Sequence, residues 1–347
     1  MQNKIAIHHR TVGFSRRWID YCNAHGIAYK TVDCFAPDIL QQLSDVDGLM
    51  WHWAHYITKD VLLARDLIKV VEDRGIKVFP NYNTCWHFDD KIGQKYLLES
   101  LNAPIVPTYI FYDKEKALQW SNHAHYPLVF KLSKGSGSQN VRLVHSAKDA
   151  RKLINTAFGK GFNPIKEVTQ YFQGARKNIK KNIHNHTLLD VVKRMPRALA
   201  DKYMRRKLFN REKGYIYFQE FLPDNHYDIR VTIIGTRAFS FTRNVRPNDF
   251  RASGSGSINY DLQRIDLRCV RLAFDITRKM KSQSAAYDFI LDAAGEPRIT
   301  EVSYCYQSQA VYNCPGHWDD QLNWHEGHMW PEDAIMMDFL HELQHSY

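Results

Sequence analysis

The chain has 347 residues, of which 44% are hydrophobic and 13% aromatic, and this accommodates two or three globular domains. It contains no run of about 18 apolar residues and no signal-peptide core, so we expect neither a membrane span nor secretion. Six cysteines without a pairing pattern fit the reduced cytoplasm. The net charge of +10 is local, because residues 174–213 hold 13 Lys/Arg and 3 Asp/Glu and the remainder is neutral.

The first 80 residues alternate between strand-like and helix-like segments. We expect strands at 5–8, 27–32, 48–53 and 76–79, and helices at 15–25, where Ser15 can act as the N-cap, 37–43 and 58–74. This alternation predicts a parallel sheet covered by helices. The loop 9–14, with Gly13, follows the first strand at the edge where such sheets bind ligands. One glycine is not a phosphate fingerprint, however, and a plain turn is the simpler interpretation.

A lysine lies in the first turn of the next predicted helix, residues 89–100. Lys91 is unfavourable beside the positive end of a helix unless an anion lies between them. The alternative is a solvated lysine paired with Asp89 or Asp90.

Residues 108–158 then predict strand 108–112, helix 113–121, strand 127–132, strand 141–144 and a helix that Ser146 opens. The Gly/Ser loop 133–139 joins two of these strands, and its backbone N–H groups can approach phosphates. Lys131, inside an apolar strand, should be buried, and a buried lysine needs an anionic partner, for which we favour phosphate. The alternative for the loop is an ordinary flexible turn.

The basic segment 174–213 has an apolar stripe at helical spacing and a cationic outer face, with Pro196 starting a second helix. Such a face can follow a polyanion, namely a phosphorylated lipid, an acidic glycan or a nucleic acid. Sparse aromatic residues argue against base stacking and so against nucleic acid. The alternative is a solvated helical face.

Arginines cluster after the next strands, which we expect at 215–222, from 228 to 234 and at 237–243. Arg243, Arg246 and Arg251 line a strand end and the glycine-rich loop 246–257. Three converging guanidinium groups suit phosphate or carboxylate ligands. A helix is predicted at 266–281.

Residues 285–303 predict a hairpin with a turn at 292–297. A turn centred between Ala294 and Gly295 sets Asp288 opposite Glu301, with Ser303 on the same face. Facing carboxylates repel each other, and a cation such as Mg²⁺ resolves the repulsion. The alternative is an ordinary hairpin with two unrelated acids.

The tail contains cysteines and histidines whose spacing matches no compact zinc pattern. We therefore do not expect zinc there, and we expect the tail tryptophans to pack. A closing helix is predicted at 331–344.

In this order the motifs resemble those of the ATP-grasp ligases, especially the glutathione synthetase and ribosomal-protein glutamyl ligase branch. The resemblance covers about residues 80–305 and implies two α+β subdomains that grip ATP, preceded by a Rossmann-like pre-ATP-grasp domain at 1–80. Within the ATP-grasp domain, 81–347, it implies a lid at about 108–218 and a metal- and substrate-binding part at 219–347. The matching elements are Asp90-Lys91, Val129-Phe130-Lys131 with the Gly/Ser loop, Gln219-Glu220-Phe221-Leu222, Asp228-Ile229-Arg230, Asn248-Asp249-Phe250-Arg251, and Asp288 with Glu301-Val302-Ser303.

The resemblance also implies roles for single residues. The nucleotide would be bound by Lys91, Lys131, Ser136, Gly137, Ser138, Glu220, Phe221 and Leu222, with Asp228 on the ribose. Arg230 and Arg243 would face the triphosphate, and Arg251 would orient the substrate carboxylate. Asp288, Glu301 and Ser303 would hold Mg²⁺, or Mn²⁺. Family members often carry Asn where Ser253 and Ser303 stand, so the chain departs from the pattern at these two positions.

The resemblance implies an ATP-dependent carboxylate–amine ligase that works through an acyl phosphate and releases ADP. The whole chain resembles amidoligases of bacterial cell-surface polysaccharide assembly, which implies a sugar carboxylate, a large anionic acceptor at 174–213, and a cytoplasmic enzyme, peripheral to the inner face of the membrane if that acceptor is lipid-linked. Two alternatives remain open. One is a peptide ligase acting on a small peptide or protein tail, and the other is a polyanion-binding protein without catalysis.

Overall fold

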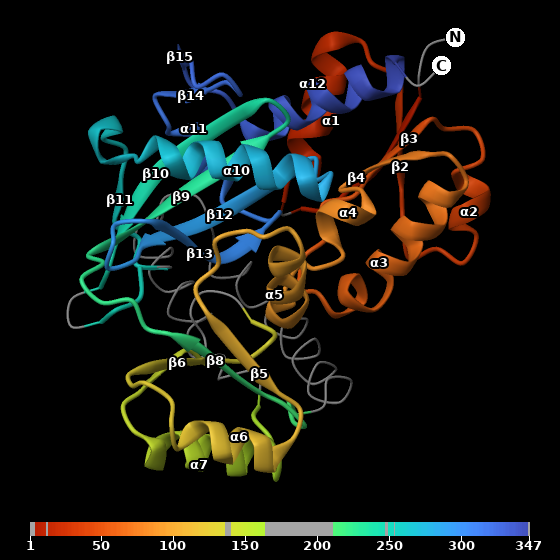
Figure 1. The fold of residues 1–347 in the computed structure, drawn as a ribbon. Coiled ribbons are helices and arrows are strands. Elements are labelled where there is room, and N and C mark those ends of the chain that lie inside the picture. Colours follow the sequence, from red (N-terminus) through yellow and green to blue (C-terminus); the bar gives the residue numbers. More distant parts are fainter. Residues whose placement is uncertain are drawn as a thin grey trace, which may run out of the picture. The chain divides into compact units, whose positions relative to one another are not determined.

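The computed structural model describes residues 4–11, 13–135, 140–163, 211–246, 249–252 and 254–345. Most of the basic segment, the loop residues Ser136, Gly137 and Ser138, and Ser253 lie outside these ranges, and their roles stay predictions. The chain forms two compact units (Figure 1). Unit 1 comprises Met1–His55, Lys59–Thr108 and Leu222–Tyr347, and unit 2 comprises Tyr56–Thr58 and Tyr109–Phe221. The domain boundaries predicted above also stay predictions.

Unit 1 begins with the predicted parallel sheet, which is confirmed, in the order β2-β1-β3-β4. Alternate residues of β1 face opposite sides. Ile5 and Ile7 pack with Trp18, whereas Ala6 packs with Ile68 on the other face. Helices therefore cover both faces of the sheet. The elements are β1 (Ile5–His8), α1 (Ser15–His25), β2 (Tyr29–Val32), α2 (Ile39–Gln42), β3 (Gly48–Met50), α3 (Thr58–Asp73), β4 (Lys77–Phe79) and α4 (Tyr82–Cys85).

The start of α1 differs from the prediction. Phe14, not Ser15, is its N-cap. The hydroxyl of Ser15 instead accepts a hydrogen bond of 2.9 Å from the backbone N–H of Arg10. Ser15 therefore holds the loop after β1 and is not the cap, while Gly26 ends the helix in the left-handed conformation.

The second sheet of unit 1 is antiparallel, in the order β13-β12-β9-β10-β14-β15, with β11 beside β10. Helix α10 covers one face (Figure 1), where Val270 and Phe274 pack on Val231 and Phe289. The elements are α5 (Lys91–Ser100), β9 (Tyr227–Ile234), β10 (Arg237–Asn244), β11 (Ile258–Asn259), η1 (Leu262–Arg264), α10 (Leu267–Met280), β12 (Ser284–Leu291), β13 (Pro297–Ser303), α11 (Ser308–Tyr312), β14 (Gly316–Trp318), β15 (Trp324–Glu326) and α12 (Pro331–Gln344).

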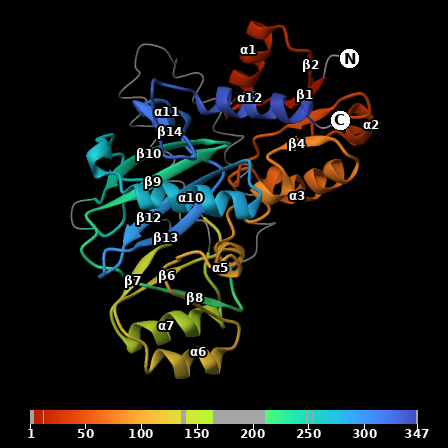
Figure 2. The same ribbon diagram turned by 45° about the horizontal axis from the view of Figure 1, so that its top comes forward.

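Unit 2 contains a four-stranded sheet in the order β5-β8-β6-β7. Helices α6 and α7 lie on the same side of it (Figure 2), and Ala117 and Ile154 from these helices pack with Phe130 and Phe218. The elements are β5 (Thr108–Phe111), α6 (Lys114–Ser121), β6 (Leu128–Lys131), β7 (Arg142–Val144), α7 (Ala147–Ala157) and β8 (Ile216–Glu220). Ser146 caps α7 by accepting from the N–H of Asp149, as predicted.

Within the described ranges, none of the helices has the length and apolar character needed to cross a membrane. The same ranges contain no group of three or more His, Cys, Asp or Glu side chains arranged to hold a metal.

Candidate active site

The hairpin of β12 and β13 makes the predicted pairing, although its turn is centred on Ala294, where Leu291 pairs with Pro297, and not between Ala294 and Gly295. Asp288 pairs with Glu301, and Ala286 pairs with Ser303. The ladder shifts by one residue directly after Asp288, and the hydroxyl of Thr300 donates to the carbonyl of Asp288 at 3.1 Å. The prediction that Asp288 and Glu301 pair across the hairpin is therefore confirmed.

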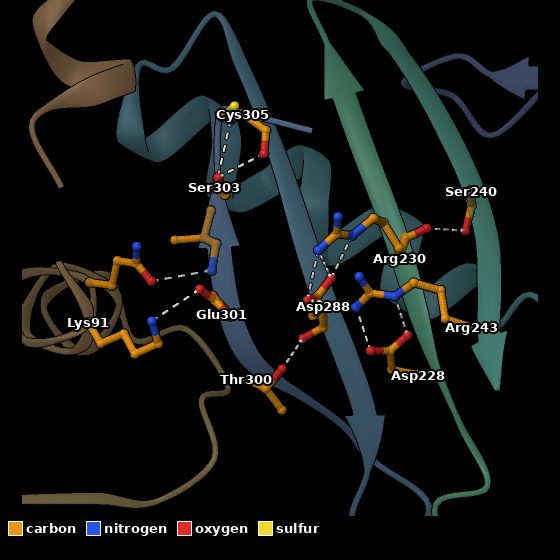
Figure 3. Close-up of polar contacts among 12 residues, drawn as sticks. Lys91, Asp228, Arg230, Ser240, Arg243, Asp288, Thr300, Glu301, Ser303 and Cys305 are labelled. Atoms are coloured by element: carbon orange, nitrogen blue, oxygen red, sulfur yellow. Dashed lines mark hydrogen bonds and ion pairs between the residues drawn. The ribbon is translucent and has the colours of Figure 1, made fainter. Parts of the chain in front are cut away.

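Charged residues continue from this pair across the neighbouring strands, as Figure 3 shows. Arg230 on β9 pairs with Asp288 on β12, and Arg243 on β10 pairs with Asp228 on β9. Asp228 and Arg230 alternate with Ile229 and Val231, which pack under α10, so the charged residues occupy the opposite face.

Asp288 is the centre of this network. It accepts two hydrogen bonds from Arg230, at 2.7 Å from Nε and 2.9 Å from Nη2. Nη2 of Arg243 lies 2.7 Å from Oδ2 of Asp288, the same oxygen that accepts from Nη2 of Arg230. Only 3% of Asp288 is exposed, so two guanidinium groups compensate one buried carboxylate.

Asp228 holds the second arginine. It accepts from Nε of Arg243 at 2.8 Å and also from Nη2. Both residues are buried, at 7% exposed each. Asp228 thus fixes the guanidinium of Arg243 against Asp288. The ribose contact implied for Asp228 is untested and stays a prediction.

The two buried carboxyl groups have opposite pKa shifts. Burial and the charge of Asp288 raise the pKa of Asp228. Burial would also raise the pKa of Asp288, but the charges of Arg230 and Arg243 outweigh it and hold that pKa below its usual range. The network therefore retains the charge of Asp288 in preference to that of Asp228.

Lys91 reaches the other carboxylate of the hairpin. It is 7% exposed, in the first turn of α5, and its Nζ lies 3.4 Å from Oε1 of Glu301. Asp90 caps the helix by accepting from the N–H of Gly93 at 3.0 Å. The sequence did not indicate that the partner of Lys91 would include Glu301, because the two residues are 210 positions apart.

Ser303, the third predicted metal ligand, contacts the backbone beyond its strand. Its hydroxyl donates to the carbonyl of Cys305 and accepts from the N–H of the same residue, both at 3.1 Å. This contact closes a turn at the end of β13. A ligand role for Ser303 stays a prediction.

The arginines of the glycine-rich loop do not gather at one point as expected. Arg243 pairs with Asp228 and Asp288, whereas Arg251 forms a fork on Asp249, with Nε at 2.8 Å from Oδ1 and Nη2 at 2.6 Å from Oδ2. Arg246 also lies 3.7 Å from Asp249. Asp249, in the same loop, thus contacts both Arg246 and Arg251, whereas Arg243 contacts carboxylates on the strands.

In unit 2, Lys131 is buried as predicted, at 8% exposed. Its Nζ donates to Oε1 of Gln219 on the adjacent strand at 2.7 Å. Glu220, one residue further, accepts from the hydroxyl of Tyr109 at 2.8 Å. The sequence did not show that Gln219 would accept a hydrogen bond from the buried ammonium group of Lys131.

Two further residues missed by the sequence hold the start of the Gly/Ser loop. The backbone N–H of Ser133 contacts the hydroxyl of Tyr215 at 2.7 Å and the carboxylate of Glu212 at 3.1 Å. Glu212 also accepts from the N–H of Lys134 and from Tyr215. The available signal was that Glu212 is one of only three acids in the strongly basic segment 174–213.

The donor set on the hairpin suits a hard divalent cation. Mg²⁺ binds one or two carboxylates and completes its shell with water and phosphate oxygens. Asp288 and Glu301 supply two opposed carboxylates, and the hydroxyl of Ser303 lies on the same strand as Glu301. Each carboxylate also has a cationic partner, so its charge is already compensated by the protein.

No protein-family model matches the chain. The α-aminoadipate–LysW ligase LysX of Saccharolobus solfataricus is 33% identical over 88 residues, which are 25% of this chain and 32% of that protein. The chain thus matches about a third of the length of this relative.

Solved structures are similar over the whole chain. The D-alanine–D-alanine ligase of Bacillus anthracis, complexed with ATP, has a TM-score of 0.59 at 11% identity and is covered in full, as is this chain. The ATP-grasp ligase PsnB, complexed with its minimal precursor, Mg and ADP, has a TM-score of 0.55 at 12% identity, with 98% of each chain covered. At these identities the likeness concerns the fold. The chain has the ATP-grasp fold, as its motifs predicted.

Proposed function

We propose that this protein is an ATP-dependent ligase that joins a carboxylate to an amine. The observation that carries the proposal is the set of charged residues on one face of the antiparallel sheet, in a chain with the ATP-grasp fold. Asp288 and Glu301 face each other, with Arg230, Arg243 and Lys91 against them. Paired cations and carboxylates of this kind suit phosphoryl transfer, which needs positioning and charge neutralisation more than a protein nucleophile.

The proposed reaction has two steps. A carboxylate oxygen of the acid takes the γ-phosphoryl group of ATP, and ADP leaves. The nitrogen of the amine then attacks the carbonyl carbon of the acyl phosphate and displaces phosphate, losing one proton as the amide forms. The lysines and arginines would neutralise charge on the transferred group.

The residue roles follow the motifs. Lys91 and Lys131 are proposed to bind phosphates, and their burial supports this, since a buried ammonium group strengthens an anion's binding. Glu220, Phe221 and Leu222 would contact adenine, and Asp228 the ribose. Arg230 and Arg243 would face the triphosphate, and Arg251 the substrate carboxylate.

Asp288 and Glu301 are proposed to hold Mg²⁺, with Ser303 or water as a further oxygen ligand. The ion would neutralise phosphate charge when bound. Arg230 and Arg243 hold Asp288 ionised through their charges. The protein therefore supplies a deprotonated carboxylate oxygen.

The proposed substrate class is supported by fewer observations than the reaction type. A sugar carboxylate amidated in surface polysaccharide synthesis is supported by the basic segment 174–213, with 13 Lys/Arg, which would bind an acidic glycan or lipid-linked acceptor. The alternative is a ligase acting on a peptide or protein tail. The name of the relative LysX, a ligase of α-aminoadipate and LysW, supports that alternative.

The proposal is tested by screening carboxylate–amine pairs, uronic-acid glycans included, for nucleotide products in the presence of Mg²⁺. We expect ADP and phosphate in equal amounts with one class of pair. Release of AMP and pyrophosphate would instead indicate an adenylating enzyme. Salt-sensitive binding to acidic glycan with no ATP turnover for any pair would favour the non-catalytic alternative.

A further inference from the structure

A second polar cluster lies at the carboxyl edge of the parallel sheet. Arg10 follows β1, His52 follows β3, and Asp60 lies in the first turn of α3. Nη1 of Arg10 is 2.6 Å from Oδ2 of Asp60, and this oxygen also accepts from the N–H of Ala54 at 2.6 Å. The three side chains are mostly buried, since His52 is 6% exposed, Asp60 0%, and the side chain of Arg10 13%.

Four polar atoms of this cluster have no hydrogen-bond partner among the described residues. They are Nη2 of Arg10, both ring nitrogens of His52, and Oδ1 of Asp60. A buried polar atom without a partner loses its hydration and gains nothing in return. Folded proteins pair nearly all such atoms with protein, water or ligand. A cluster of four therefore indicates that something else supplies their partners.

Gly13 shows that two of these atoms face the same space. A Cβ added to Gly13 would lie 2.9 Å from Nδ1 of His52 and 3.2 Å from Nη2 of Arg10. Both nitrogens therefore lie beside the Cα of Gly13, where even a methyl group would press on them, and both are buried. Gly13 and the neighbouring Thr11 are exposed, so this space lies directly beneath the surface.

The ring of His52 is fixed and neutral. It stacks on Phe14, with ring centroids 3.8 Å apart and planes 9° apart, and Tyr304 packs against it edge-on. Burial and the charge of Arg10 lower the pKa of His52 to about 3. It can therefore donate from one nitrogen and accept at the other near neutral pH. The free oxygen of Asp60 adds an acceptor beside these donors.

We propose that Arg10, His52 and Asp60 form a recognition site for a carboxylate that has an N–H or O–H donor beside it. The carboxylate accepts from Nη2 of Arg10 and from His52, and the neighbouring donor contacts Oδ1 of Asp60. Two sources share this chemistry, namely an α-amino acid and a uronic acid. That the bound group belongs to a substrate rests on the proposed ligase function, whereas binding itself does not.

Calorimetric titration of the full chain without ATP tests the site. The probes are L-alanine and D-glucuronate, compared with propanoate, which lacks the donor, and L-alaninamide, which lacks the carboxylate. We expect alanine or glucuronate to bind at least tenfold more tightly than both comparison probes. Preference for alanine assigns the site to the amine substrate, and preference for glucuronate assigns it to the acid.

His52→Phe is the decisive variant, because it keeps the aromatic stack and changes no charge at neutral pH. We expect it to weaken probe binding at least tenfold and to raise the Tm, since two unpaired nitrogens are removed. His87→Phe is the matched control. His87 is also buried with both ring nitrogens unpartnered among the described residues, and its replacement should leave binding unchanged.

A raised Tm of His52→Phe with unchanged probe binding, or equal binding of all four probes, would overturn the proposal and leave a buried water as the partner. A failure of the ligase screen with selective probe binding would reject the proposed function and keep the site.

Discussion

The two polar clusters of unit 1 differ in how completely their atoms are paired. On the antiparallel sheet, the carboxylate oxygens of Asp228 and Asp288 all contact Arg230 or Arg243. At the edge of the parallel sheet, Arg10, His52 and Asp60 leave four buried polar atoms unpaired among the described residues. The first cluster is complete by itself, whereas the second needs an external partner.

The difference follows from topology. Antiparallel strands bring oppositely charged residues to facing positions on one face, so Arg230 meets Asp288 and Arg243 meets Asp228 through register alone. The carboxyl edge of a parallel sheet instead collects loop residues, where ligands commonly bind. We therefore expect loss of a carboxylate in the first cluster to destabilise the protein as well as to impair nucleotide binding, and loss of an unpaired atom in the second to weaken ligand binding without lowering stability.

The largest effect on stability is expected for Asp288→Asn. It leaves the buried guanidinium group of Arg243 and the partly buried one of Arg230 without their shared carboxylate, so the free energy of unfolding should fall by about 3–5 kcal/mol. Urea denaturation measures this. Asp275→Asn is the control, because Asp275 forms an exposed pair with Arg278 at 3.2 Å and should change stability by about 0–1 kcal/mol. Equal effects of both variants would show that the sheet network contributes no special stability.

Asp60 should give stability an unusual pH dependence. Burial raises its pKa to about 6, although Arg10 opposes the rise. Because the pKa of Asp60 is higher in the folded than in the unfolded protein, protonation of Asp60 favours the folded state. This stabilisation is complete below the unfolded pKa, near 4, and is lost as the pH rises through 6. The difference in unfolding free energy between the wild type and Asp60→Asn should thus fall by about 3 kcal/mol from pH 4 to pH 7. A flat difference would mean that Asp60 is not desolvated.

A gain of stability is expected for His52→Phe. Removing two buried, unpaired nitrogens should raise the free energy of unfolding by about 1–3 kcal/mol in the absence of ligand. Thermal and urea unfolding without added carboxylates measure it. A loss of stability of the same size would show that the nitrogens are already paired in the ligand-free protein.

The smallest effect on stability is expected for Glu301→Gln, together with a large loss of activity. The side chain of Glu301 is 33% exposed and its contact with Lys91 is 3.4 Å, so stability should change by about 0–1 kcal/mol. Loss of a carboxylate proposed to hold Mg²⁺ should lower the rate of ADP formation by about 1000-fold. Undiminished turnover at the same Mg²⁺ concentration would remove Glu301 from the metal site.

The sequence predicted local features well. The glycine turn and the alternation around it predicted the hairpin and the pairing of Asp288 with Glu301, although this pairing also depends on a one-residue bulge after Asp288 that the sequence did not reveal. The burial of Lys131 followed from its position inside an apolar strand. Both features depend mainly on residues that are close together in the sequence.

Contacts between distant segments could not be predicted. Arg230 faces Asp288 only because β9 lies between β10 and β12 in the sheet, and no local pattern encodes that order. The same holds for Lys91 with Glu301. The unpaired atoms at the parallel-sheet edge were hidden more completely, since the sequence showed Gly13 as a turn residue and His52 as part of a strand.

The central claim is phosphoryl transfer from ATP to a carboxylate. It is tested most directly with the acid identified in the screen, labelled with ¹⁸O in its carboxylate and turned over with ATP, Mg²⁺ and the amine. The account predicts ADP, an amide, and one ¹⁸O atom per turnover in the released phosphate, seen by ³¹P NMR. Label in AMP, or unlabelled phosphate at full turnover, would contradict it.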